Sequence, residues 1–264
     1  MRILAIALCA LALFTYVQSS PVQAKPLTCM GCSFSRADLH GRDFRSVRYI
    51  GADFQNADLH DADFSNAHLT GADFTGADLR GSNFSGVDCE GCDFRGARMN
   101  GMRISRITLT GATLDGAAGG LGDDQLRALL EHCVGCELRG AHLAGRDLSG
   151  VSTVGVDMSD ADAASTRFAN ASLIGSEFRG ADLHGADFSG AALCWHNVSE
   201  RGGTWSVNRG QTSCADLRGA NVRGARFTGV RICDTENRVT RCSAVDAETL
   251  RRYSGSSLEG AVLP

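Results

Sequence analysis

The sequence places an apolar residue at every fifth position over much of its length. The stretch DADFSNAHLTGADFTGADLR, residues 61–80, contains four such units in succession. A small residue, usually alanine, lies two positions before each apolar centre, and a polar residue lies one before it. Glycine or another turn-forming residue lies two positions after it. A period of five matches neither a helix nor a strand. It predicts a backbone that turns a corner once in every five residues.

The apolar centres also predict the size of a coil. They form three runs, over residues 29–114, 133–198 and 217–232. Residues 20 apart carry similar side chains, so that four units make one coil and like side chains stack in columns: Phe34, Phe54, Phe74 and Phe94; Phe44, Phe64 and Phe84; Leu39, Leu59, Leu79 and Met99. Aromatic rings one strand spacing apart, about 4.8 Å, can stack with an offset. The pattern predicts a squared, all-β solenoid with the centres inside.

This repeat, A-[DN]-[LF]-x-x, resembles that of the pentapeptide-repeat family over most of residues 27–263. The resemblance implies a right-handed quadrilateral parallel β-helix and a function that is usually non-enzymatic. The absence of proline between Pro26 and Pro264 agrees with a backbone whose N–H groups are needed for pairing between coils. The motif says much about the fold and little about the function.

Breaks in the repeat predict short helical insertions and a domain organisation. In GLGDDQLRALLEH, Asp123 and Asp124 suit a helix start, and three leucines form one apolar side. A second helix is predicted over 245–253. The predicted order is a signal peptide (1–24), repeat block 1 (25–119), a helical elbow (120–132), repeat block 2 (133–198), a disulfide-closed loop (199–213), further repeats (214–232), and a loop, short helix and C-terminal cap (233–264).

The first 24 residues have the pattern of a secretory signal peptide. Arg2 precedes an apolar run, and the small residues around Ala24 suit cleavage there. The run is shorter than the roughly 20 residues that span a membrane. We therefore expect a periplasmic or secreted bacterial protein with no membrane span after cleavage. Its mature chain would have 25 basic and 30 acidic residues, because cleavage removes Arg2.

Cleavage would also leave ten cysteines, an even number that is typical of disulfides in an oxidising compartment. Three C-x-G-C motifs each flank one predicted turn and could be closed by a disulfide: Cys29 and Cys32, Cys89 and Cys92, Cys133 and Cys136. Reduced cysteines packed in the core are the main alternative. A zinc site or a redox pair is disfavoured, because the motifs lie coils apart and point inward.

Four further cysteines bracket two segments in which the repeat fails. Cys194 and Cys214 enclose one segment and Cys233 and Cys242 the other, so we expect disulfides that close two loops. The first loop carries the candidate interaction residues Trp195, His196, Arg201, Trp205 and Arg209. The alternative is that its two indoles fold back over the solenoid.

No catalytic, cofactor-binding or metal-binding motif emerges. His40 and His60 stack one coil apart, but their column continues as Arg80 and Asn100 and offers no third ligand. The aspartate columns follow the repeat on several faces and indicate solvated surface.

The sequence therefore favours an exported, non-enzymatic scaffold that binds a macromolecule, most simply a protein, through the solenoid face or the tryptophan loop. Two alternatives remain. One is a DNA-mimic that interacts with gyrase or topoisomerase, as the resemblance implies for some members, and the other is a metal- or thiol-handling protein. The small net charge predicts no nucleic-acid partner, and end-to-end packing of solenoids predicts a homodimer.

Overall fold

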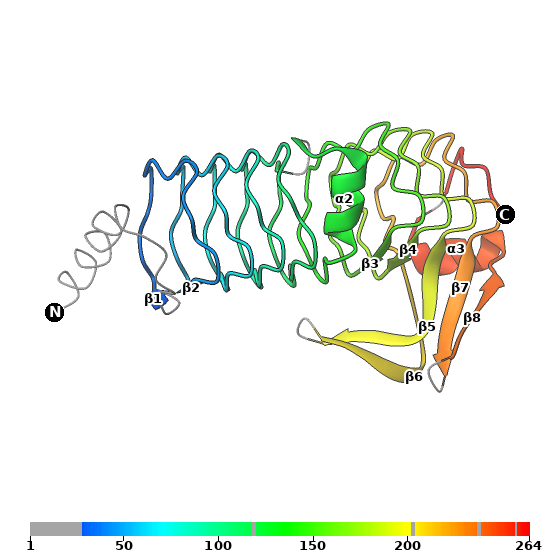
Figure 1. Ribbon diagram of the computed structural model, residues 1–264. Helices are drawn as coiled ribbons and strands as arrows, with labels where there is room; N and C mark the ends of the chain where they lie inside the picture. The colour runs from blue at the N-terminus through cyan, green and yellow to red at the C-terminus, as the bar shows by residue number, and fades with distance from the viewer. Residues whose placement is uncertain (1–27, 118–119, 202–203, 237–238, 257) are drawn as a thin grey trace. The chain divides into compact units, whose positions relative to one another are not determined.

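The computed structural model describes residues 28–117, 120–201, 204–236, 239–256 and 258–264 (Figure 1). For residues 196–201, 204–213, 235–236, 239 and 253 it describes the backbone alone. The chain divides into two compact units, Met1–Thr113 and Leu114–Pro264. The predicted signal peptide lies outside the described residues, so its removal stays a prediction.

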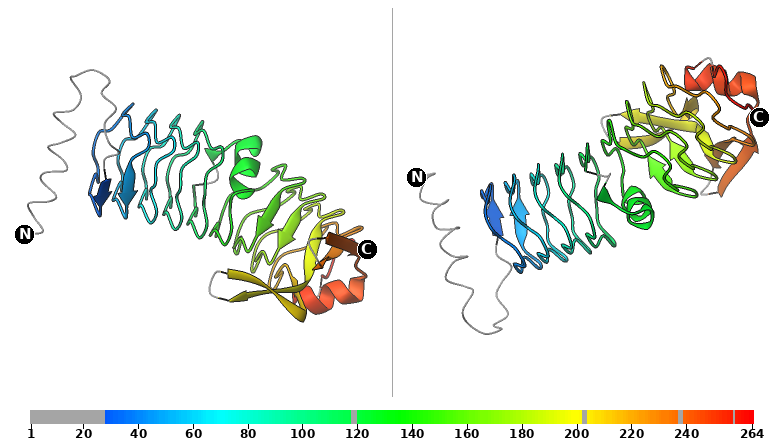
Figure 2. Two further views of the ribbon diagram at one scale, coloured as in Figure 1. Left: turned by 60° about the horizontal axis from the view of Figure 1, so that its bottom comes forward. Right: turned by 90° about the horizontal axis from the view of Figure 1, so that it is seen from above.

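Unit 1 consists of coils that pair in parallel with a spacing of 20 residues. Strand β1 (Thr28–Met30) pairs with β2 (Arg48–Ile50), with Cys29 opposite Tyr49. Isolated parallel bridges continue the same spacing, for example from Asp38 to Asp58 and from Asp58 to Asp78. This register has the 20-residue spacing that four five-residue units predict. The successive turns are visible in both views of Figure 2.

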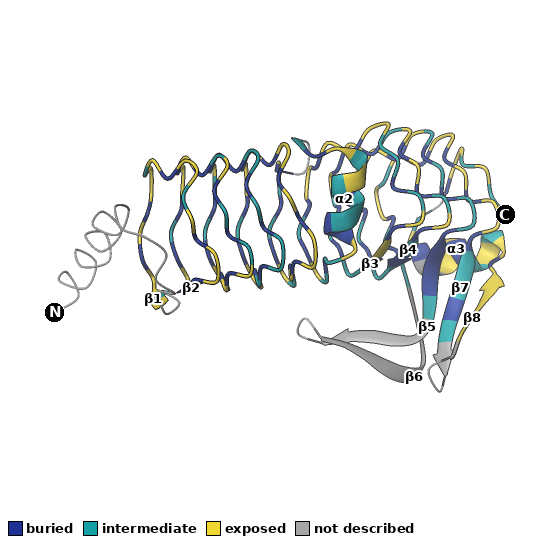
Figure 3. Ribbon diagram, viewed as in Figure 1, coloured by how far each residue is buried: buried dark blue, intermediate teal, exposed yellow. Residues whose placement is uncertain are grey.

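The apolar centres of unit 1 form its core. The side chains of Phe54, Phe64, Phe74 and Phe84 are completely buried. Phe54 and Phe74 stack with their ring centroids 5.0 Å apart, while Phe64 meets Phe74 edge-to-face at 5.9 Å. Figure 3 shows buried residues alternating with exposed ones along each coil. The predicted aromatic columns therefore exist, and contacts between columns tie them together.

The corners are tight turns with a left-handed residue, as the repeat predicts. At one corner Ala57 N–H donates to the Phe54 carbonyl at 3.1 Å, and Asn56 between them has φ 54°. One coil later Gly76 occupies the same position with φ 67°. Glycine tolerates this conformation freely, and asparagine tolerates it better than most residues. The corner positions therefore explain the glycine content of the repeat.

Helix α2 (Asp123–Leu130) is the first helix or strand in the described part of unit 2, and it lies within the predicted 120–132 segment. Leu126, Leu129 and Leu130 are buried, as expected for the apolar side of this helix. The Asp123 carboxylate accepts hydrogen bonds from the Arg146 guanidinium at 3.0 Å and from Asp147 N–H at 3.1 Å. These bonds hold the start of α2 against the coil that follows it. A role as an elbow stays a prediction.

The coils of unit 2 again pair at a 20-residue spacing, through β3 (Ser152–Val154) and β4 (Ser172–Ile174). The spacing then changes to 39, as in the contact between Asp182 and Asn221. The extra residues form β5 (Ala192–Arg201) and β6 (Thr204–Cys214). A second insertion forms β7 (Arg231–Glu236) and β8 (Val239–Ala244).

These strands correct two sequence predictions. The segments 199–213 and 233–242 were expected to be loops, but both belong to antiparallel β-hairpins. Val198 was expected to end a run of core centres, yet it lies in β5 opposite Val207 of β6. Strand β5 already begins at Ala192, so the hairpin starts before the repeat visibly fails in the sequence.

The chain ends with helix α3 (Ala247–Ser254) and a short segment that rejoins the coils. The Asp246 side chain accepts from Thr249 N–H at 2.7 Å and caps the helix start. At the last residue of α3, the Ser254 carbonyl accepts a hydrogen bond from Leu217 N–H at 2.9 Å. Beyond the helix, the Val262 carbonyl accepts one from Phe227 N–H at 2.8 Å. The final repeat thus pairs with the preceding coil. No helix among the described residues is long and apolar enough to cross a membrane.

Candidate functional site

The two hairpins lie side by side and form a four-stranded surface, β6–β5–β7–β8, that we call the hairpin sheet. Its central strands, β5 and β7, are parallel, because each continues the same edge of two successive coils. Trp195 pairs with Cys233 and His196 pairs with Asp234 across them. An isolated two-stranded hairpin is only marginally stable in water. Pairing of β5 with β7 therefore joins two weak elements into one sheet anchored on the coils (Figure 1).

A cysteine pair crosses each hairpin near the coils. Cys194 lies directly opposite Cys214, with a Cα–Cα distance of 3.9 Å, and Cys233 lies opposite Cys242, at 4.0 Å. The three C-x-G-C motifs also bring their cysteines together, with Cα–Cα distances of 6.0, 5.3 and 5.4 Å: Cys29 and Cys32, Cys89 and Cys92, Cys133 and Cys136. These are the five pairs that the sequence suggested.

The candidate interaction residues all lie on the first hairpin. Trp195 is half-buried, and its indole N–H is buried without a hydrogen-bond acceptor among the described residues. Arg201 pairs with Thr204 at the tip of the hairpin, and Trp205 pairs with Glu200. His196, Arg201, Trp205 and Arg209 are strand residues whose side chains lie outside the description. The backbone therefore places them on one hairpin, and their role stays a prediction.

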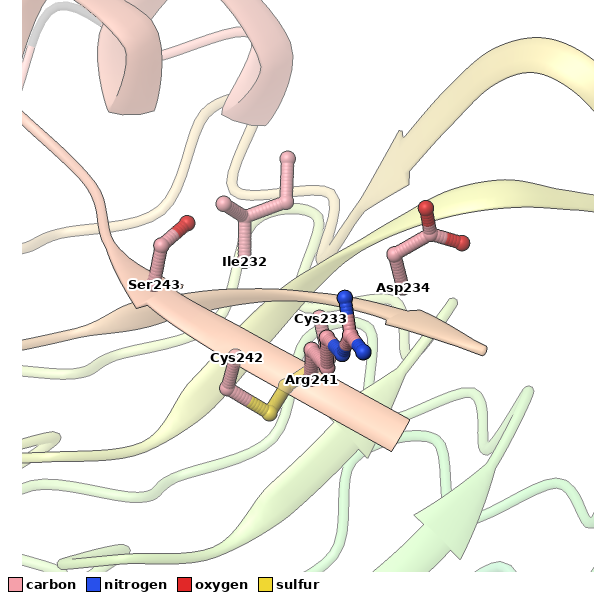
Figure 4. A pocket seen from close by; sticks show the side chains of 6 residues that line it. All are labelled: Ile232, Cys233, Asp234, Arg241, Cys242 and Ser243. Carbon is pink, nitrogen blue, oxygen red and sulfur yellow. A yellow bond between two sulfur atoms is a disulfide. The ribbon is translucent and has the colours of Figure 1, made fainter. Parts of the chain in front are cut away.

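The second hairpin carries an open pocket of about 310 Å³ (Figure 4). Its lining includes Ile232, Asp234, Arg241 and Ser243. Ile232 is opposite Ser243 and Asp234 is opposite Arg241, so these four side chains share one face of the hairpin. Cys233 and Cys242 also line the pocket. The lining therefore combines apolar Ile232 and the cysteine pair with one acid, one base and one hydroxyl group.

An ion-pair ladder on the coils of unit 2 is a feature that sequence reasoning missed. The acidic residues form one column across the coils: Glu137, Asp157, Glu177 and Asp216. Arginines beside this column bridge neighbouring coils. Arg139 contacts Asp157 at 2.6 Å, and Arg179 contacts both Glu177 at 3.1 Å and Asp216 at 2.6 Å. The repeat shows acidic and basic columns separately, but only the stacking shows that they pair.

Asp216 is the best satisfied member of this ladder. Its carboxylate accepts from Arg179 at 2.6 Å and from two nitrogens of Arg218, at 2.9 and 2.6 Å, and its side chain is 17% exposed. Burial acts to raise the pKa of Asp216, but the hydrogen bonds from Arg218 and Arg179 outweigh it. They hold that pKa well below its ordinary value.

Asp216→Asn is expected to lower the free energy of unfolding at pH 7 by about 1–2 kcal/mol, because hydrogen bonds to a charged group are lost in a partly exposed setting. The folded-state pKa lies below the unfolded value of about 3.9. The stabilisation is therefore present above about pH 4 and is lost as the pH falls. Urea unfolding at pH 7 and pH 3 measures the difference. Asp162→Asn, which changes an exposed aspartate, is the control. The account would be contradicted if the difference in the free energy of unfolding between wild type and Asp216→Asn is as large at pH 3 as at pH 7.

Three solved structures illustrate what the chain is similar to. A pentapeptide-repeat protein of the Arabidopsis thaliana thylakoid lumen is 32% identical, with 43% of this chain and 83% of that protein covered and a TM-score of 0.26. HetL, a pentapeptide-repeat protein involved in heterocyst differentiation regulation from the cyanobacterium Nostoc sp. strain PCC 7120, is 23% identical over 81% of this chain and 94% of its own, with a TM-score of 0.43.

Rfr23, a pentapeptide-repeat protein of the cyanobacterium Cyanothece 51142, is 31% identical over 34% of this chain, with a TM-score of 0.33. The match spans 61% of the length of Rfr23. TM-scores this low say nothing about what the chain binds. No curated protein matches the chain.

The family comparison agrees with the repeat that the coils display. The description "Pentapeptide repeats" matches eight copies, over residues 32–71, 62–101, 72–111 and 164–195. The matches lie on stretches where residues 20 apart pair in parallel and apolar centres are buried. They leave out most of the hairpin sheet, and they indicate no catalytic family. The chain belongs to the pentapeptide-repeat family.

Proposed function

We propose that this protein is an exported, non-enzymatic scaffold that binds a protein partner through the hairpin sheet. We further propose that its coils form the right-handed quadrilateral β-helix of its family and that its five cysteine pairs are disulfides. The leader-like segment 1–24 and the even number of remaining cysteines support export.

The observation that carries the proposal is the pairing of β5 with β7. Two insertions interrupt a regular repeat in neighbouring coils, and both form hairpins whose inner strands pair with each other. Among the described residues, β6 pairs with β5 and β8 pairs with β7, and no further strand pairs with either of them. We propose that the partner adds a strand to one of these outer strands. The pocket beside Asp234 and Arg241 adds a place for side chains of such a strand.

The DNA-mimic alternative requires a continuous acidic face, and the arginines interrupt it. In unit 1, Asp43 pairs with Arg45 at 2.6 Å, and Asp78 pairs with Arg80 at 2.6 Å and with Arg98 at 3.2 Å. These contacts neutralise the acidic columns locally. The hairpin sheet is therefore the better candidate surface.

The test is site-specific photo-crosslinking in cells that express the protein with its own leader. A crosslinker at Asp234 on the hairpin sheet is expected to capture one protein, and the same crosslinker at exposed Gln55 on the coils is expected not to. The captured protein should then bind the purified chain, and should stop binding when residues 197–211 are replaced by a short turn that keeps Cys194 and Cys214. Equal capture from both positions, or unchanged binding by the shortened chain, would contradict the proposal.

A further inference from the structure

Two histidines and an aspartate meet on the surface of unit 1. His40 and His60 occupy the same position in consecutive coils, and their rings stack with centroids 4.8 Å apart and an interplanar angle of 25°. His60 Nε2 lies 3.2 Å from Asp61 Oδ2. One potential ligand atom from each of the three residues lies within 4.8 Å of the others.

The structure thus supplies the third group that the sequence did not reveal. The histidine column continues as Arg80, as the sequence shows. The third ligand is instead Asp61, the residue that directly follows His60. Asp61 occupies a turn position with φ 58°, where most corners of unit 1 have glycine. Its counterparts in the neighbouring coils, Gly41 and Gly81, have no side chain. The carboxylate therefore occurs at this corner in only one coil, beside the two imidazoles.

A hydrogen bond to the backbone orients the His40 ring for metal binding. His40 Nδ1 lies 3.0 Å from the His60 carbonyl oxygen and can donate to it, which leaves Nε2 as the nitrogen with a free lone pair. Histidines that bind metals usually donate their other ring N–H in this way. Asp38 and Asp58 accept hydrogen bonds from the backbone N–H groups of His40 and His60, at 3.3 and 3.2 Å, and fix both turns.

The arginine that follows the two histidines in their column forms hydrogen bonds with another carboxylate. Arg80, one coil beyond His60, donates to Asp78 through Nε at 2.8 Å and through Nη2 at 2.6 Å. Its guanidinium therefore points to Asp78, and the contact of Asp61 Oδ2 is with His60 Nε2. Imidazole nitrogens with one carboxylate oxygen suit copper and zinc ions better than magnesium or calcium.

We propose that His40, His60 and Asp61 bind one divalent transition-metal ion of the Cu²⁺ or Zn²⁺ type, with water completing its coordination. Metal–ligand bonds of about 2.0–2.2 Å require the three ligand atoms to approach somewhat closer than they do now. His40 and Asp61 are exposed and His60 is half-buried, so their side chains can rotate to close that distance. The site is independent of the proposed partner surface.

The test is a Cu²⁺ titration of the untagged full chain with any free thiols alkylated, followed by calorimetry and by electron paramagnetic resonance. One equivalent is expected to bind, with two nitrogen donors. His40→Gln and His60→Gln should each weaken binding at least about tenfold and leave one nitrogen donor, since even outer-shell changes cost about 10–100-fold. Asp61→Asn should also weaken binding while keeping a residue that tolerates positive φ.

His68 provides the matched control. It is a histidine of the same unit with a carboxylate nearby, Asp88 at 3.5 Å, but the next residue of its column is that aspartate and not a second imidazole. His68→Gln should bind Cu²⁺ as the wild type does. Circular dichroism without metal checks that each variant is folded. Absence of a bound equivalent, or equal weakening in His68→Gln and His60→Gln, would overturn the proposal.

Discussion

Replacing Phe74 with alanine is expected to lower the free energy of unfolding by about 3–5 kcal/mol. Phe74 is fully buried and stacks between Phe54 and Phe94, with ring centroids 5.0 and 5.2 Å away. It also meets Phe64 and Phe84 edge-to-face, at 5.9 and 5.5 Å. Alanine would remove all of these contacts and leave a cavity where coils on both sides constrain its collapse. Urea unfolding followed by circular dichroism measures the loss.

Two controls make this result specific to the aromatic column. Phe74→Leu keeps an apolar side chain and should cost about 1.5 kcal/mol. Gln55→Ala changes an exposed residue on the preceding coil and should cost within about 0.5 kcal/mol. If Phe74→Ala lowers the free energy of unfolding by no more than Phe74→Leu does, the stacked rings do not form a core that stabilises the coils.

Removal of the Cys194–Cys214 pair is expected to lower the free energy of unfolding by about 3 kcal/mol, the value for a disulfide that closes a loop of this length. The two cysteines are 20 residues apart, and they join strands that otherwise depend on hairpin pairing. The change is the double variant Cys194→Ala with Cys214→Ala, measured by thermal and urea unfolding without reductant.

The matched control is the double variant Cys89→Ala with Cys92→Ala. Its cysteines are three residues apart, so a disulfide between them restricts the unfolded chain much less. We expect a smaller loss of stability than for the hairpin pair. Unfolding curves that shift equally, or a hairpin variant that matches wild type, would mean that Cys194 and Cys214 do not crosslink the folded chain.

The coils could be predicted from sequence because each repeat position has one physical task. A centre such as Phe74 must be apolar to fill the interior, and a corner such as Gly76 must tolerate positive φ. These demands recur in every coil, so they appear directly as a five-residue period. The coil size of 20 was predicted from the similar side chains of residues 20 apart, and the parallel bridges have that spacing.

The hairpins were harder to predict because their pairing depends on how the coils stack. Gly202-Gly203 between strand-forming residues is a hairpin signal that could have been used. The pairing of β5 with β7 could not have been predicted from the sequence. It joins residues such as Trp195 and Cys233, which become neighbours only because the coils stack.

The histidine and aspartate cluster was missed for a related reason. The five-residue pattern assigns the position of Asp61 to turn-forming residues, but the side chain of Asp61 also contacts His60. Sequence columns relate residues at one repeat position. They do not show that a corner residue can reach the residue before it.

The most direct test of the proposed export and of the proposed disulfides is the intact mass of unreduced, alkylated protein expressed from the full sequence, combined with peptide mapping. We predict a chain that begins at Lys25, has no alkylated thiols, and yields linked peptides for Cys194 with Cys214 and for Cys233 with Cys242. A chain that keeps Met1 and carries alkylated cysteines at these positions would contradict both export and the closure of the hairpins.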